Sequence, residues 1–182
     1  MTLGRRLTSM RAVVTVFACL LALGLQTSAA QADVLKVGDR LVELDVATDG
    51  NGRAVKLKSY KDRWLFVTVG AGWCVPCKKE LPAWDKVAAD LKSKLTFVAL
   101  TLDDDIADGK RFHKKLGLKN MVVVYLPQDK SAVAARYGAQ TMPSTFVIDP
   151  KGVVRMVHAG FKERDPNGEY KKMKAALEKL VK

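Results

Sequence analysis

Two cysteines separated by two residues, Cys74 and Cys77, carry the clearest chemical signal in this 182-residue chain. An apolar run at residues 64–69, typical of a buried strand, precedes them. Apolar residues at helical spacing follow them, at Leu81, Trp84, Val87, Ala88 and Leu91. Strand, short turn and helix is the context in which a C-x-x-C pair performs redox chemistry. We therefore predict a dithiol that exchanges electrons with other disulfides.

The position of the pair at a predicted helix start gives each cysteine a role. Side chains three residues apart on a helix are neighbours, close enough for the short Cα separation of a disulfide. Free N–H groups and the helix dipole stabilise a thiolate at the first cysteine. We predict Cys74 as the attacking thiol and Cys77 as the resolving thiol. Val75 and Pro76, which lie between them, are expected to tune the redox equilibrium.

Such a pair can also form a structural disulfide or half of a metal site. A structural disulfide stabilises most when it closes a long loop, and this one would enclose only two residues. A zinc site needs further ligands, yet Cys19 is the only other cysteine, and His113 and His158 form no second paired motif. The sequence therefore favours dithiol chemistry with no metal and with no cofactor beyond the Cys74–Cys77 disulfide.

The run from residue 73 to residue 82, W-C-V-P-C-K-K-E-L-P, resembles the active site of thioredoxin-like proteins. More narrowly, it resembles the TlpA/ResA type of exported thiol–disulfide oxidoreductases. The resemblance covers nearly all of residues 34–182, and its second element, Thr141-Met142-Pro143-Ser144-Thr145, lies where that family carries a cis-proline. It implies a thioredoxin-like fold and a reaction by thiol–disulfide exchange.

The resemblance also implies a substrate-binding surface around the cysteines. Trp73 resembles the family's active-site tryptophan, which offers a flat apolar surface beside the sulfur; simple packing is the alternative. Met142 and Pro143 would face the disulfide, and the residue before the proline would pair its backbone with an extended substrate segment. We assign Trp73, Val75, Pro76, Met142 and Pro143 to this surface.

Glu80 lies three residues after Cys77, so the two side chains can meet on one helix face. A carboxylate there can take the proton of the resolving thiol, and the family pattern C-x-x-C-x-x-E-x-P supports this catalytic role. A solvated helix glutamate is the alternative. Many thioredoxins hold a buried aspartate where this chain has Thr68, so proton transfer would use Glu80 or water. The run Gly-Ala-Gly at residues 70–72 replaces a bulkier aromatic-containing run, which predicts a more open surface near Trp73.

Residues 1–32 are predicted to be an export signal peptide. Three arginines among the first 11 residues precede an apolar stretch at residues 12–25, and Ala30-Gln31-Ala32 fits a cleavage site. Fourteen apolar residues are fewer than the roughly 20 that cross a bilayer, so we expect cleavage rather than a retained anchor. An exported dithiol protein would act in the periplasm, where disulfides form.

Residues 33–182 are long enough for one domain with its own core. The chain has 31 Lys and Arg against 19 Asp and Glu, and loss of the three leader arginines leaves 28 against 19, a net charge of +9. Such a charge suits an acidic partner or an anionic membrane face, but a solubilising surface is the simpler interpretation. No nucleic-acid-binding motif accompanies it, so we expect no nucleic-acid partner. We expect a monomer.

Strand-like and helix-like segments alternate along the predicted domain. This order predicts an α/β fold with a central mixed sheet of four or five strands flanked by helices. Further strands are expected at residues 95–100 and 121–126, with an antiparallel pair within 146–154. Helix boundaries are expected at Gly117, at 131–137 and at Asp165-Pro166. Two short apolar runs, 41–44 and 54–57, flank a turn and predict an N-terminal β-hairpin extension.

Two further polar features lie between the predicted strands. Asp103, Asp104 and Asp105 have the composition of a carboxylate metal cluster, but acids at a helix start cap N–H groups and complement the dipole. We expect capping. His113 lies among lysines and is expected on the surface.

Taken together, these patterns predict an exported protein-disulfide reductase that a membrane electron donor keeps reduced. The resemblance implies partners such as apocytochrome c or copper-centre assembly proteins. One alternative is a disulfide oxidase or isomerase, and another is a redox-sensing or Cu(I)-binding module, which two thiolates would suit. A peroxidase relative shares the strand pattern, but such enzymes place a lone cysteine where this chain has a C-x-x-C.

Overall fold

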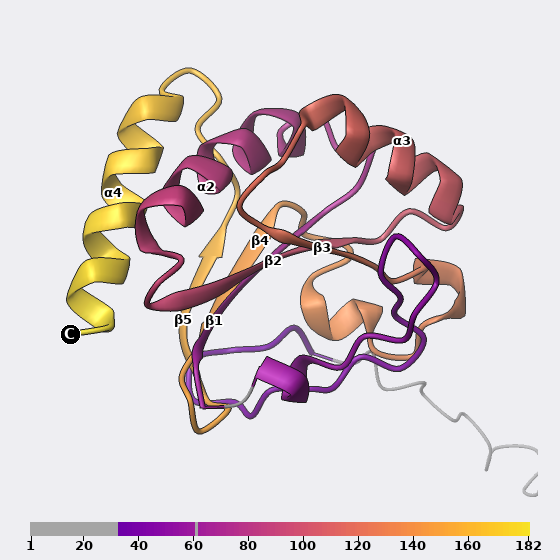
Figure 1. Cartoon of the computed structure of the whole chain (residues 1–182), viewed down its shortest axis with the longest axis horizontal. Helices are drawn as coiled ribbons and strands as arrows, with labels where there is room; N and C mark the ends of the chain where they lie inside the picture. Colours follow the sequence, from indigo (N-terminus) through magenta and orange to yellow (C-terminus); the bar gives the residue numbers. More distant parts are fainter. Residues whose placement is uncertain (1–32, 61) are drawn as a thin grey trace, which may run out of the picture. The chain divides into compact units, whose positions relative to one another are not determined.

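The computed structural model describes residues 33–60 and 62–182. Within them, one sheet of five strands, in the order β3-β2-β1-β4-β5, is flanked by three α-helices (Figure 1). The strands are β1 (Trp64–Gly70), β2 (Leu95–Thr101), β3 (Val122–Tyr125), β4 (Ser144–Ile148) and β5 (Val154–Ala159). The helices are α2 (Cys77–Leu91), α3 (Ile106–Leu116) and α4 (Pro166–Leu180), with 3-10 helices η1 (Leu57–Tyr60), η2 (Gln128–Lys130) and η3 (Ala134–Tyr137). The predicted signal peptide and Cys19 lie outside the described residues.

β1 lies at the centre of the sheet and leads directly to the two cysteines. It pairs in parallel with β2 and antiparallel with β4, so the predicted mixed sheet is confirmed. All its residues after Trp64 are buried, as expected of a strand covered on both faces. Because parallel strands end at the same edge, Gly70 of β1 lies opposite Thr101 of β2. The loops that follow these two strands therefore meet.

Different elements cover the two faces of the sheet. On one face, Phe66 of β1 packs with Trp84 of α2 and Met173 of α4. On the other, Val67 packs with Leu57 and other buried residues of the N-terminal segment and η3. Figure 1 shows the α-helices together on one side and the N-terminal segment on the other. Among the helices of the described ranges, none has the length and apolar character needed to cross a membrane.

The predicted N-terminal hairpin is present only around its turn, where the Val55 N–H donates to the Ala47 carbonyl and the Asp49 N–H donates to the Arg53 carbonyl. Thr48 forms an isolated bridge with Ala54, but residues 33–60 contain no regular strand. The run 41–44 does not pair with 54–57 as a strand. The Leu41 N–H donates instead to the Gly152 carbonyl, and the carboxylate of Glu43 accepts hydrogen bonds from the first two N–H groups of η1. A side chain that caps the 3-10 helix thus takes the place of strand pairing.

The predicted helix ends are borne out more closely. Asp165 caps α4 by accepting a hydrogen bond from the Gly168 N–H, and Pro166 is its first residue. Gly117 ends α3 in the left-handed conformation, at φ 63°. The short helix predicted at residues 131–137 begins three residues later, as η3.

Only one of the three consecutive aspartates caps α3. Asp105 accepts a hydrogen bond from the Ala107 N–H, as predicted. Asp104 instead accepts one from the Asp129 N–H. Asp103 is 5% exposed and turns back toward the loop before the cysteines, so the capping prediction is wrong for Asp103 and Asp104.

His113 is buried, and the prediction of a surface position is wrong. Its ring packs edge-on against Phe112 and Tyr125, which fixes it in the core despite the lysines beside it in sequence. Neither ring nitrogen has a hydrogen-bond partner among the described residues. Burial lowers the pKa of His113 to about 4, although the nearby Asp103 carboxylate acts in the opposite direction.

This depressed pKa predicts a loss of stability in acid. The unfolded chain binds a proton at His113 below pH about 6.5, whereas the folded chain does so only near pH 4. The contribution of His113 to stability therefore falls as pH falls across that window, by roughly 1 kcal/mol per pH unit. His113→Phe removes this contribution, and urea unfolding at pH 4 to 7 measures it. Equal pH slopes for the two proteins would contradict the assignment.

Candidate active site

Cys74 and Cys77 form a disulfide between the end of β1 and the start of α2. Their Cα atoms are 5.4 Å apart. α2 begins at Cys77, so Cys74 lies in the turn just before it, where its N–H donates to the carbonyl of Ala71. Pro76 precedes the helix in a helical conformation and provides no side-chain cap. The N-terminal end of the helix dipole therefore faces the sulfur of Cys74.

The two cysteines differ slightly in exposure. Cys77 is 0% exposed and Cys74 is 5% exposed, so both are buried and Cys74 is the more accessible of the two. Trp73 and Val75, on either side of Cys74, are each 61% exposed. A partner approaching the disulfide would meet these two side chains first.

The loop at Met142 and Pro143 lies beside the apolar cluster that contains the cysteines. The peptide bond between these two residues is cis. Pro143 is buried, and its carbonyl accepts a hydrogen bond from the Gly160 N–H. Met142 is half-buried and packs against the apolar cluster that contains Cys74 and Cys77.

Close approach explains two of the glycines before the cysteines. A Cβ at Gly70 would lie 3.2 Å from Cys77 Sγ, and one at Gly72 would lie 3.2 Å from an oxygen of Asp103 and 3.4 Å from Phe112. Asp103 and Phe112 therefore pack closely against Gly72, whereas Trp73 beside it is 61% exposed. The glycines thus allow α2 and α3 to pack tightly against this loop.

Asp103 supports the active-site loop and was missed as a site residue. Both of its carboxylate oxygens accept from the Gly72 N–H at 3.0 Å, and one accepts from the Thr101 hydroxyl at 2.7 Å. Its place just past the end of β2, beside the end of the parallel strand β1, was the available signal. Gly72 is two residues from Cys74, so Asp103 fixes the turn that presents the sulfur.

Glu80 is fully buried, which excludes the alternative of a solvated helix glutamate. One of its oxygens accepts a hydrogen bond from the Thr68 hydroxyl at 3.2 Å, and Thr68 in turn accepts from the Thr145 hydroxyl at 3.1 Å. The other oxygen has no hydrogen-bond partner among the described residues. A chain of hydroxyls therefore runs from β4 through β1 to Glu80.

Burial raises the pKa of Glu80 to about 8. The indole N–H of Trp84 and the Thr68 hydroxyl favour the ionised carboxylate and so act to lower this pKa, but burial outweighs them. The Trp84 N–H does so without forming a hydrogen bond to the carboxyl. A carboxyl with a pKa near 8 changes its protonation close to neutral pH. It is therefore able to take up and release a proton beside Cys77.

The lysines near the cysteines lie on the surface. Lys78 and Lys79 are exposed, and Lys79 pairs with Glu163 at 3.2 Å. Exposed cations are screened by solvent, so their effect on a thiol is weak. Within the described ranges, no group of three or more His, Cys, Asp or Glu side chains could hold a metal ion.

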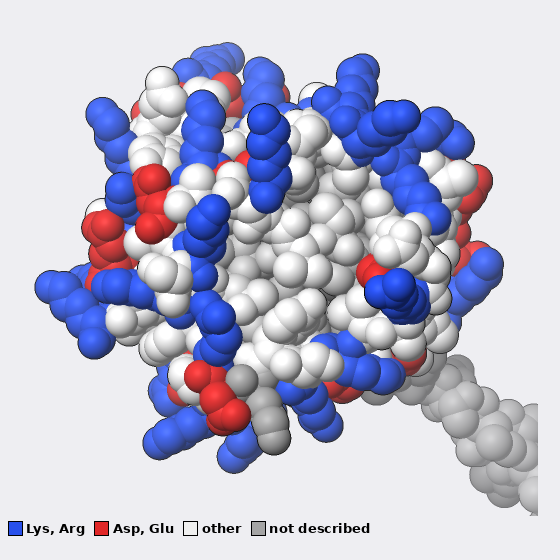
Figure 2. Space-filling model, in the orientation of Figure 1, with Lys and Arg blue, Asp and Glu red and all other residues white. Residues whose placement is uncertain are grey.

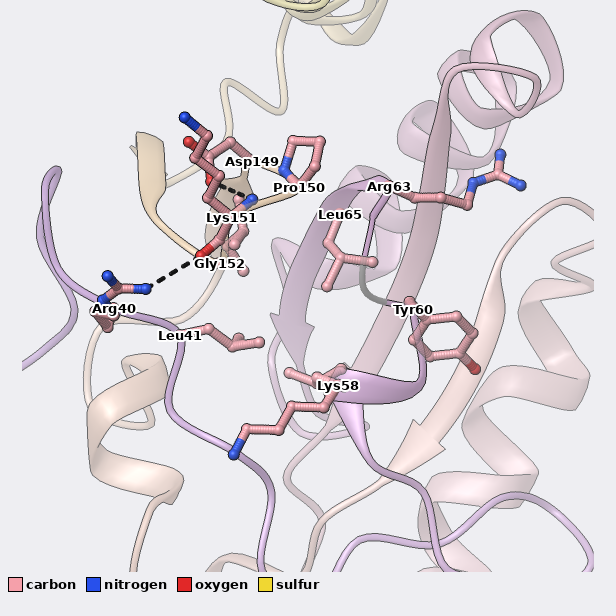
Figure 3. Close-up of a pocket in the computed structure, with 12 residues that line it drawn as sticks. Arg40, Leu41, Lys58, Tyr60, Arg63, Leu65, Asp149, Pro150, Lys151 and Gly152 are labelled. Atoms are coloured by element: carbon pink, nitrogen blue, oxygen red, sulfur yellow. Dashed lines mark hydrogen bonds between the residues drawn. The ribbon is translucent and has the colours of Figure 1, made fainter.

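A separate hollow of about 200 Å³ lies at the other end of β1, beside Leu65. Figure 3 shows its apolar floor and the hydrogen bond from Arg40 to the carbonyl of Lys151 at its rim. Leu65 pairs with Ile148, whereas the cysteines follow the opposite end of the strand. The hollow contains no thiol, so the candidate active site is the region around the disulfide.

The comparisons with known proteins agree with this site. Residues 37–157 match the AhpC/TSA family. Thiol-disulfide oxidoreductase ResA of Bacillus thuringiensis subsp. konkukian is 31% identical over 129 residues, which are 70% of this chain and 72% of that protein. The protein of the same name from Bacillus subtilis is 32% identical over 116 residues, 63% of each chain.

Among solved structures, one described as a thiol:disulfide interchange protein DsbE, from Chlorobium tepidum, is similar with a TM-score of 0.65 and 28% identity. The match covers 79% of this chain and 99% of that one. These similarities confirm the resemblance to ResA-type thiol–disulfide oxidoreductases and the thioredoxin-like fold. The family match spans well over half of the chain. The chain therefore belongs to the AhpC/TSA family.

Proposed function

We propose that this thiol–disulfide oxidoreductase is an exported protein-disulfide reductase that acts through Cys74 and Cys77. The observation that carries the proposal is the disulfide itself. It lies at a helix start with Cys74 slightly exposed and Cys77 enclosed, beside the Met142–Pro143 loop. A structural disulfide would need neither this difference in exposure nor a buried acid one helical turn away.

In the proposed reaction the reduced protein gives two electrons to a partner disulfide. The Cys74 thiolate attacks one partner sulfur, the partner S–S bond breaks, and a mixed disulfide forms. The Cys77 thiolate then attacks Cys74 Sγ, which breaks the mixed disulfide and releases the second partner thiolate. The partner leaves as a dithiol and the protein keeps the Cys74–Cys77 disulfide.

Glu80 is the proposed proton acceptor for Cys77. The resolving thiol must lose its proton before it can attack, and it lies in an apolar environment that disfavours a free thiolate. Glu80, on the next turn of the same helix, has a pKa raised to about 8. This value lies between those of an ordinary carboxyl and an ordinary thiol, so Glu80 can accept the proton as Cys77 attacks.

The proposed substrate surface consists of the residues around the exposed edge of Cys74. Trp73 and Val75 would contact the partner directly, and Pro76 would support them at the start of α2. Met142 and Pro143 would align an extended partner segment against the disulfide by backbone pairing. This surface binds a polypeptide rather than a small molecule.

The proposed partners are exported proteins with disulfides, such as apocytochrome c or copper-centre assembly proteins. A membrane thiol–disulfide donor would restore the dithiol, and no dissociable cofactor is required. The proposed location is the periplasm, with residues 1–32 cleaved as a signal peptide and residues 33–182 acting as a monomeric domain. The similarity to proteins named ResA and DsbE supports this proposal.

We expect both cysteine variants to lose reductase activity, but only one of them to trap a mixed disulfide with its partners. With dithiothreitol as donor, the protein should reduce insulin disulfides, and Cys74→Ser and Cys77→Ser should fall to the rate of dithiothreitol alone. Cys77→Ser keeps the attacking thiol and should accumulate mixed disulfides with partners on non-reducing gels, whereas Cys74→Ser should trap few. Trapping by Cys74→Ser instead would reverse the assigned roles, and full insulin activity in Cys74→Ser would exclude the reaction.

The reduction potential separates the reductase from the oxidase alternative. Potentials in this fold run from roughly −270 mV for thioredoxin to about −120 mV for a strong oxidant. A reductase should lie near the lower end of this range. Equilibration of the Cys74–Cys77 pair with dithiothreitol buffers, read by thiol alkylation and mass spectrometry, measures the value. A potential near −120 mV would favour a disulfide oxidase.

Glu80→Gln should slow the resolving step and remove its pH dependence. In the unsubstituted protein, release of the mixed disulfide should rise with pH through a pKa near 8, as Glu80 becomes an available base. Loss of a general base should lower the release rate by about 100-fold or more. Quenched-flow assays between pH 6 and 9 measure the profile, and an unchanged profile would assign the proton to water.

The same variant should also show the effect of Glu80 on stability. Folding raises this pKa from 4.5 to about 8, so the folded state holds the proton more tightly. The contribution of Glu80 to stability is therefore greatest below pH 4.5 and falls by roughly 1 kcal/mol per pH unit as pH rises toward 8. Glu80→Gln should lack this fall, whereas the exposed control Glu178→Gln should keep it.

A further inference from the structure

A groove of about 450 Å³ adjoins the candidate active site on the side of α3. Gly72 and Trp73, which directly precede Cys74, form one wall. The opposite wall is a stripe of α3 at positions i, i+3, i+4 and i+7, namely Asp108, Arg111, Phe112 and Lys115. Lys78 of α2 and the buried Asp103 complete the lining.

The exposed charge in this groove that lacks an ion-pair partner is positive. The Asp103 carboxylate is buried and accepts from two neutral donors, the Gly72 N–H and the Thr101 hydroxyl, which hold it in place without cancelling its charge. Asp108 forms an ion pair with Arg111. Lys78 and Lys115 make no ion pair with any other described residue, and both are exposed. Figure 2 shows that basic side chains gather over α3.

We propose that this groove binds an acidic side chain of the partner polypeptide, close in sequence to the cysteine that Cys74 attacks. The inference rests on the proposed function and names its substrate class. Trp73 is 61% exposed and joins the groove to the sulfur, so a segment lying across Trp73 places neighbouring residues beside the cations. Lys78 of α2 and Lys115 of α3 then both contact the partner's carboxylate.

The expected preference is moderate and depends on salt. One exposed ion pair changes a binding constant by about two- to fivefold, and salt weakens it. Two lysines together should therefore favour an acidic partner by roughly tenfold over a neutral one at low ionic strength. The effect should appear mainly in the rate of the encounter, because rim charges steer association.

Three disulfide-bridged peptides that differ only beside one cysteine test the proposal. Their flanking residues are two aspartates, two asparagines or two lysines. The full protein is reduced with dithiothreitol, separated from it, and mixed with each peptide in a stopped-flow instrument at 20 mM and 500 mM NaCl. The second-order rate constant for the aspartate peptide should exceed that for the asparagine peptide by about tenfold at low salt, and this ratio should shrink at high salt.

Two matched variants separate the groove from the overall positive charge. Lys115 lines the groove and Lys114 does not, although both are exposed and lie in the last turn of α3. Charge reversal at either position changes the net charge and the helix-dipole interaction equally. Lys115→Glu should lower the aspartate-to-asparagine ratio at least fivefold, and Lys114→Glu should leave it within twofold.

Each outcome has a distinct meaning. Equal rates for the three peptides, or equal effects of the two variants, would show that the groove does not bind an acidic side chain of the partner. The proposed reductase activity would be unaffected by either result. If the reduced protein reduced none of the three peptides, the proposed function would fail, and the proposed role of the groove would fail with it.

Discussion

The structure depends on the close contact between the carboxyl end of β1 and the first turn of α2. A Cβ at Gly70 would lie 3.2 Å from Cys77 Sγ, a contact tight enough that the helix would have to shift slightly, so glycine permits the closest approach of strand and helix. This contact encloses Cys77 and places Glu80, one turn later, over Thr68 of the same strand. The difference in exposure between the two cysteines follows from it. A wider gap would let water reach both sulfurs and the carboxyl.

The mixed sheet brings two further segments to the same edge. β2 ends beside β1 and sends Asp103 back to the Gly72 N–H, and β4 begins there, just after the Met142–Pro143 loop. Thr145 of β4 extends the hydroxyl chain to Glu80. The site is therefore built from chain segments that only the sheet topology brings together. Its precision comes from rigid strands rather than from long loops.

The sequence was informative wherever local chemistry determines structure. Buried strands follow from apolar runs, and the start of α4 follows from the cap at Asp165 and the proline after it. The predictions from sequence failed where a contact with a residue elsewhere in the fold determines the local structure. Glu43 caps η1 where strand pairing was predicted, and His113 is buried because Phe112 and Tyr125 surround it. The C-x-x-C could be found from spacing alone, whereas the support by Asp103 depends on the register of two strands that are far apart in sequence.

Two buried carboxyls lie near the cysteines, and their hydrogen bonds assign them different tasks. Asp103 receives the Gly72 N–H on both oxygens and the Thr101 hydroxyl on one, so it is held as a fixed acceptor that orients the loop. Glu80 receives a single hydroxyl and keeps one oxygen without a partner among the described residues. Few donors in an apolar site leave the charged form poorly stabilised, which raises the pKa. Glu80, the carboxyl with the fewer donors, is therefore the one that we propose as the proton acceptor of the dithiol, whereas the hydrogen bonds of Asp103 suit it to hold the loop before Cys74 in place.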